Sequence, residues 1–151
     1  MWNLKPEERL REWKSFRNYI SGLPLQTALA ETSKLWSYAP YVNHYLAPDL
    51  VSEWPDPWVL IHENYYCDLA KTLGMFYTLY LSQHYLRDIT NLEIEVYRNQ
   101  PRSEEHYIVS INQGKYILNL VFNTIVNKSS ITEDLILRHR YSVADLKLDL
   151  H

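Results

Sequence analysis

The segment from Cys67 to Leu81 constrains the fold most, because it is apolar on nearly every side. A surface helix has a single apolar stripe, whereas a helix that is apolar all round is enclosed by other elements. The segment therefore predicts a central buried helix, which we expect to end near Tyr85. Gly74 costs about 1 kcal/mol relative to alanine inside a helix, so it indicates a point of close packing.

Two amphipathic helices are predicted before this segment. Pro6 followed by two glutamates fits a helix start, and apolar residues then recur at helical spacing up to residues 21–22. A second periodic stretch begins near Pro24 and ends before Pro40. We expect these two to form a helical hairpin. A further helix is predicted at Asp56-Pro57, because Asp caps free amides and Pro fits the first helical position.

The second half of the chain changes to the alternation that is typical of half-buried strands. The predicted strands are Leu92 to Tyr97, His106 to Asn112 and Lys115 to Phe122, and the stretch from Ser130 to Arg140 fits either helix or strand. The tail from Val143 to Leu150 fits a last strand or a short helix. The sequence thus predicts an α+β fold, in which N-terminal helices and a central buried helix pack on a small antiparallel sheet. With 151 residues we expect a single domain. Its parts are a helical hairpin at 1–46, central helices at 57–86 and the sheet at 91–128.

Composition excludes several classes of function. The net charge of −3 gives no positive field for nucleic acid or anionic lipid. The start lacks the apolar stretch of a signal peptide, and no apolar run approaches the length that spans a bilayer. We therefore expect a protein of the cytoplasm or of a virion. A single cysteine and six scattered histidines offer no ligand spacing, so neither a metal nor a cofactor is expected.

One group of predicted neighbours could form a catalytic site. A two-residue hairpin loop at Gln113-Gly114 pairs the flanking strands so that Ile108 lies opposite Asn119. His106 and Asn119 are then diagonal neighbours on one face of the sheet, while the alternate residues from Tyr107 onwards form an apolar face. A three-residue loop would separate the two side chains. If the Cys67 helix covers the apolar face, His106 points away from the sulfur.

The order of these residues resembles the transglutaminase-like branch of papain-like thiol enzymes. Cys67 opens the central helix, His106 lies in the run His-Tyr-Ile-Val-Ser-Ile, and Asn119 ends Gly-Lys-Tyr-Ile-Leu-Asn. The resemblance covers roughly Trp54 to Phe122. It implies that Cys67 is the nucleophile, His106 the base and Asn119 the residue that orients the base. A lone cysteine on an apolar helix is more often an inert core residue, and that interpretation stays open.

A second resemblance involves the run Trp54-Pro55-Asp56-Pro57-Trp58, which is similar to small proteins of tailed bacteriophages. It implies a structural or assembly protein of a phage particle that binds other subunits, with Trp54 and Trp58 as candidate contact residues. Two functions therefore remain. We favour the assembly protein, and the alternative is a cysteine acyl-transferase or amidohydrolase with a triad of Cys67, His106 and Asn119.

Overall fold

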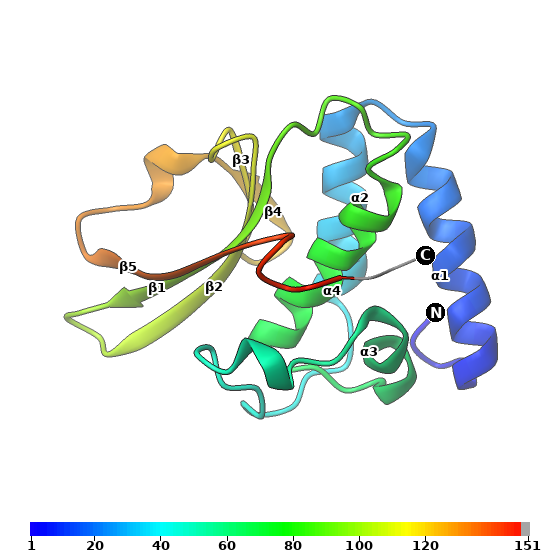
Figure 1. Ribbon diagram of the computed structural model, residues 1–151, viewed down its shortest axis with the longest axis horizontal. Coiled ribbons are helices and arrows are strands. Elements are labelled where there is room, and N and C mark those ends of the chain that lie inside the picture. Colours follow the sequence, from blue (N-terminus) through cyan, green and yellow to red (C-terminus); the bar gives the residue numbers. More distant parts are fainter. Residues whose placement is uncertain (149–151) are drawn as a thin grey trace.

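Helices occupy the first half of the chain and strands the second, as the two periodicities predict. The computed structural model describes residues 1–148. Its α-helices are α1 (Pro6–Ser21), α2 (Leu25–Ser37), α3 (Pro57–Glu63) and α4 (Asp68–Ser82), and its strands are β1 (Leu92–Asn99), β2 (Glu104–Ile111), β3 (Tyr116–Val121), β4 (Thr124–Val126) and β5 (Leu135–Ser142). Figure 1 shows the helices gathered on one side of the sheet, with α4 between α1 and the strands. The predicted α+β architecture is confirmed.

The helix starts follow the local sequence. Pro6 occupies the first turn of α1, where Glu7 and Glu8 complement the positive end of the helix dipole. Asp56 caps α3, because its Oδ1 accepts a hydrogen bond from the amide of Val59 at 2.8 Å. Both predicted starts are confirmed, whereas α4 ends at Ser82 rather than near Tyr85.

Helix α4 is the buried centre of the molecule. It contacts α1, α2 and α3 on one side and β1, β2 and β3 on the other. Gly74 is the point of closest approach, since a Cβ atom there would lie 2.4 Å from ring carbons of Trp36 on α2. Glycine is thus required for packing, as the sequence indicates. No helix within residues 1–148 is long and apolar enough to cross a membrane.

A single hydroxyl ties the helices together. Thr78 Oγ1 accepts hydrogen bonds from the indole nitrogens of Trp13 on α1, at 3.0 Å, and of Trp36 on α2, at 2.9 Å. The same hydroxyl donates to the Gly74 carbonyl at 2.7 Å. A hydroxyl has one donor and two acceptor sites, so every hydrogen-bonding site of the Thr78 hydroxyl is occupied. The two indoles are completely buried, so no solvent could replace it.

The strands form one antiparallel sheet in the order β4-β3-β2-β1-β5. The predicted hairpin register is confirmed, because Val109 pairs with Leu118 and Ile111 with Tyr116. Gln113 and Gly114, at the tip, have φ values of 55° and 83°, as the left-handed positions of a tight hairpin require. The stretch from Ser130 to Arg140, predicted as either helix or strand, contributes residues 135–140 to β5, which is an edge strand of the sheet. Of the expected tail element at 143–150, residues 143–147 form turns, and 149 and 150 lie outside the described residues.

The predicted alternation of side chains between the two faces of β3 is observed only up to Leu118. Asn119 has a φ of 70°, and the pairing of β3 with β4 shifts register between Ile117 and Val121. This bulge reverses the alternation. Leu120 therefore packs with Ile108 and Ile117 on the face away from α4, although strict alternation places it on the α4 face. Asn119 in turn contacts α4.

Replacing Thr78 by valine should destabilise the fold strongly. The change keeps the shape but leaves two buried indole N–H groups without an acceptor, each costing about 1–3 kcal/mol. We expect the free energy of unfolding, measured by urea denaturation, to fall by about 2–6 kcal/mol. Thr27→Val is the matched control, since Thr27 is exposed on α2. Equal midpoints for the two variants would contradict the proposed role of the hydroxyl.

Replacing Gly74 by alanine should also destabilise the protein, although alanine is the better helix former. The new methyl group would overlap the Trp36 ring and force α2 and α4 apart, at a cost of about 1–3 kcal/mol. Gly22→Ala serves as control, because its nearest neighbour would lie at an ordinary 3.8 Å. Thermal unfolding should show a lower midpoint for Gly74→Ala alone. A gain in stability at position 74 would refute the close approach.

Candidate active site

A hollow of about 310 Å³ lies at the N-terminus of α4. We call it the thiol hollow; it is lined by Tyr41, His44, Cys67, Asp68, Ser103, Glu105 and Tyr107. Cys67 is the N-cap residue of α4, and its side chain makes no capping hydrogen bond. The first amides of a helix lack intrahelical acceptors, so they are available to stabilise negative charge in this hollow. Cys67 is only 1% exposed, which makes access to its sulfur depend on this opening.

The loop between α2 and α3 carries His44 to the same hollow. Its backbone runs beside the strand-like stretch before Cys67: the Val42 amide donates to the Tyr66 carbonyl at 3.1 Å, and the Tyr66 amide donates to the Pro40 carbonyl at 2.9 Å. On the other side of His44, the Tyr45 hydroxyl lies 3.1 Å from Glu63 Oε2. The loop is thus anchored on both sides of the imidazole.

Strand β2 forms the opposite wall of the hollow through Tyr107 and Glu105. Burial, followed by the negative charge of Glu105, raises the pKa of Tyr107 to about 12. The phenol therefore stays protonated at neutral pH and can donate a hydrogen bond into the hollow. Thr72 of α4 donates to the Tyr107 carbonyl at 2.7 Å, which fixes β2 against the helix.

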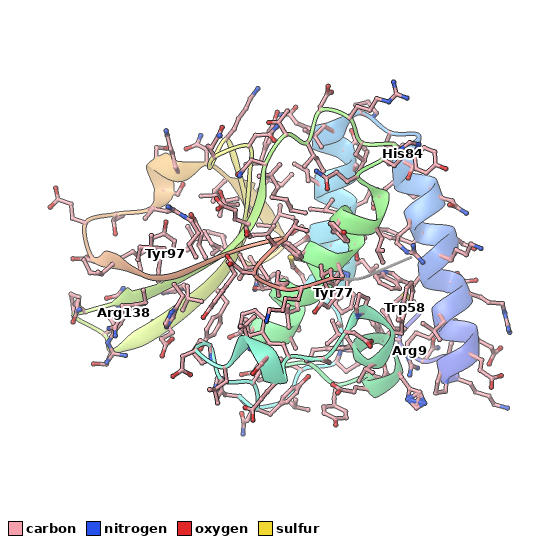
Figure 2. All side chains as sticks on the ribbon, in the orientation of Figure 1. Arg9, Trp58, Tyr77, His84, Tyr97 and Arg138 are labelled. Carbon is pink, nitrogen blue, oxygen red and sulfur yellow. The ribbon has the colours of Figure 1, made fainter. Side chains whose placement is uncertain are left out.

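Of the predicted triad, the structure brings Asn119 to the helix of Cys67 but leaves His106 outside the hollow. Helix α4 packs on the face of β2 that carries Tyr107 and Val109. Since successive side chains of a strand alternate, His106 lies on the other face with Ile108. This is the packing that separates the imidazole from the sulfur. His106 pairs with Tyr97 of β1, and Figure 2 shows Tyr97 on the side of the sheet away from the helices.

Asn119 does not contact an imidazole. Its Nδ2 donates to Thr72 Oγ1 at 2.8 Å, to the Tyr107 carbonyl at 3.2 Å and to the Asp68 carbonyl at 3.4 Å. The left-handed backbone at Asn119 turns the amide toward α4, which strict alternation could not reveal. The predicted neighbour of His106 is therefore a clamp between β2, β3 and the first turn of α4.

The two candidate contact tryptophans differ in their surroundings. Trp54 is 9% exposed, and its indole donates to the Ala47 carbonyl at 2.8 Å, so it holds the loop before α3 in place. Trp58 on α3 is 43% exposed and packs edge-to-face on Trp13. Figure 2 shows it beside α1. Only Trp58 presents a substantial apolar surface to solvent.

The charges in the thiol hollow are unevenly distributed. Asp68 and Glu105 contribute carboxylates, and His44 contributes the one imidazole among the side chains that line the hollow. Within residues 1–148, no group of three or more His, Cys, Asp and Glu side chains is arranged to hold a metal ion. The arrangement fits nucleophilic chemistry by a thiol with an imidazole as its base. No sequence pattern marks His44, because it lies in an aperiodic loop between Asn43 and Tyr45.

Comparison with known proteins finds similar solved structures. No family model matches the sequence, and no curated protein matches it. Solved structures of LapG from Legionella pneumophila are similar: the calcium-bound form has a TM-score of 0.72 at 14% identity, covering 93% of this chain and 78% of LapG. The EGTA-treated form has a TM-score of 0.69 at 15% identity, covering 95% of this chain and 80% of LapG. At this identity the likeness shows the fold alone, and that fold is transglutaminase-like.

Proposed function

We propose that this chain is a cysteine acyl-transfer or hydrolytic enzyme acting on an amide, with Cys67 as its nucleophile and His44 as its base. The observation that supports this most is the position of Cys67, which caps the central helix of a transglutaminase-like fold and lines a hollow together with an imidazole. Cys67 immediately precedes the free amides of the α4 N-terminus. Thiol catalysis uses this combination.

The reaction follows from the groups in the hollow. His44 takes the proton of Cys67, and the sulfur attacks the carbonyl carbon of the amide. The free amides at the start of α4 and the Tyr107 hydroxyl stabilise the resulting oxyanion. The imidazolium then gives its proton to the leaving amine as the carbon–nitrogen bond breaks, and water or an amine releases the acyl group from sulfur.

Asn119 has a positioning role in this proposal. It does not orient the base, since its amide is directed to Thr72, Tyr107 and Asp68. It instead holds β2, the strand that carries Tyr107, against the first turn of α4. His106 has no role in the proposed chemistry.

The assembly function remains an untested prediction. The similar solved structures give no support to a phage particle, and Trp54 is occupied within the fold. Exposed Trp58 suits protein contacts, but no feature of the described residues specifies a neighbour for it. We therefore prefer thiol chemistry.

Alkylation of Cys67 tests the proposed dyad. Iodoacetamide at neutral pH should modify Cys67 in the folded protein, because His44 activates the sulfur. His44→Ala should slow this modification by on the order of tenfold or more, whereas His106→Ala, the matched control on the other face of the sheet, should leave it unchanged. Mass spectrometry of the Cys67 peptide gives the rates.

Three outcomes would argue against the dyad. Equal rates for the wild type and His44→Ala would remove His44 as base. Slowing by His106→Ala alone would restore the predicted triad. Complete protection of Cys67 until the protein is unfolded in urea would identify an inert core cysteine. Amide cleavage in a defined peptide mixture, lost in Cys67→Ala, is the corresponding test of activity.

Replacing Asn119 by aspartate should destabilise the protein, because a carboxylate would face the carbonyl oxygens of Asp68 and Tyr107. We expect a loss of about 3 kcal/mol in the free energy of unfolding by urea denaturation. Asn123→Asp is the matched control, since Asn123 is exposed and also has a positive φ, of 49°. Similar losses at both positions would show that the backbone conformation, and not the clamp, determines the effect.

A further inference from the structure

A second hollow adjoins the thiol hollow at the open end of the sheet. It has a volume of about 400 Å³ and is lined by Pro48, Asp49, Arg98, Glu105, Arg138 and His139; we call it the arginine hollow. Glu105 lines both hollows, so they share a wall.

One regular strand pairing and one bulge bring the two arginines into this hollow. Arg98 of β1 lies directly opposite Glu105 of β2. Arg138 lies at a bulge in β5, because Val96 pairs with His139 and Tyr97 pairs with Leu137, which leaves Arg138 without a partner on β1. The bulge allows Arg138 and His139, neighbours in sequence, to line the same hollow. Figure 2 shows Arg138 at the end of the sheet far from α1 and α2.

Neither arginine is held in an ion pair within the described residues. Within residues 1–148, the ion pairs join Arg140 to Glu93 and Glu95, and neither Arg98 nor Arg138 forms one. This holds although Glu105 and Asp49 line the same hollow. A guanidinium binds a carboxylate through parallel hydrogen bonds, and two guanidiniums can enclose one carboxylate.

The spacing of the hollows suits an extended peptide. The thiol hollow uses β2, and the arginine hollow reaches β5, two strands away in the sheet. Adjacent strands are about 4.8 Å apart, so this distance is roughly 10 Å, or about three residues of extended chain. The two arginines are balanced by Asp49 and Glu105, so the hollow has no excess charge for a polyanion such as nucleic acid.

We infer that the substrate is an extended polypeptide that carries an aspartate or glutamate about three residues from the bond attacked by Cys67, and that Arg98 and Arg138 bind this carboxylate. The inference rests on the proposed function for the position of the attacked bond. The carboxylate subsite itself requires no chemistry at Cys67.

Binding to the Cys67→Ala protein tests the subsite without any reaction. The probes are two fluorescein-labelled decapeptides of alanine, glycine and serine, which contain a single Asp or, in the matched probe, a single Asn. Fluorescence anisotropy should show binding of the Asp peptide that is on the order of tenfold tighter. The preference should weaken as salt is raised, because charge attraction is screened.

Arginine variants test which residues cause the preference for the Asp peptide over the Asn peptide. Arg98→Gln and Arg138→Gln should each reduce the preference for Asp over Asn, and Arg138→Glu should shift it toward a peptide with a single Lys. Arg102→Gln is the control, because Arg102 is exposed in the β1–β2 connection and lines neither hollow. It should retain the wild-type preference.

The outcomes separate the subsite from the enzyme. Equal binding of the Asp and Asn peptides, equal effects of Arg102→Gln and Arg138→Gln, or tighter binding of a labelled single-stranded DNA decamer would overturn the subsite. A preserved Asp preference with an unreactive Cys67 would reject the proposed enzyme and leave the carboxylate subsite standing.

Discussion

The hydroxyl of Thr78 is the contact on which the arrangement of the helices depends. It accepts the buried indole N–H groups of Trp13 and Trp36 and so joins α1 and α2 to α4. A buried indole needs an acceptor, and this core supplies both with the same atom. Glycine at position 74 allows the Trp36 ring to reach that atom, since any side chain there would collide with it.

A fixed α4 determines where Cys67 can act. The helix is held by tryptophans on one side and by the sheet on the other, so its N-terminus projects to a defined place between β2 and the loop that carries His44. Asn119 completes this fixation near the first turn of α4. The candidate nucleophile thus belongs to the most buried element of the molecule, while its proposed base and substrate contacts come from loops and strand ends.

Local patterns predicted the elements well because each pattern has a local cause. Asp56-Pro57 starts α3 through capping, and Gln113-Gly114 sets the hairpin register through its turn. The triad was less predictable. Its geometry depended on which face of β2 meets α4, and on the bulge at Asn119, and neither is encoded in the spacing of residues along a strand.

The order of residues alone is enough to predict the α+β class, the central position of the Cys67 helix, the close packing at Gly74 and the hairpin register, because periodicity, turn residues and capping act over a few neighbouring positions. Three placements emerge only when the chain is folded: His44 lines a hollow with Cys67, His106 lies on the far face of the sheet, and Arg98 and Arg138 line a second hollow. These groupings join residues that are distant in sequence, and they result from how a helix packs on a sheet and where strands bulge, which no local pattern specifies.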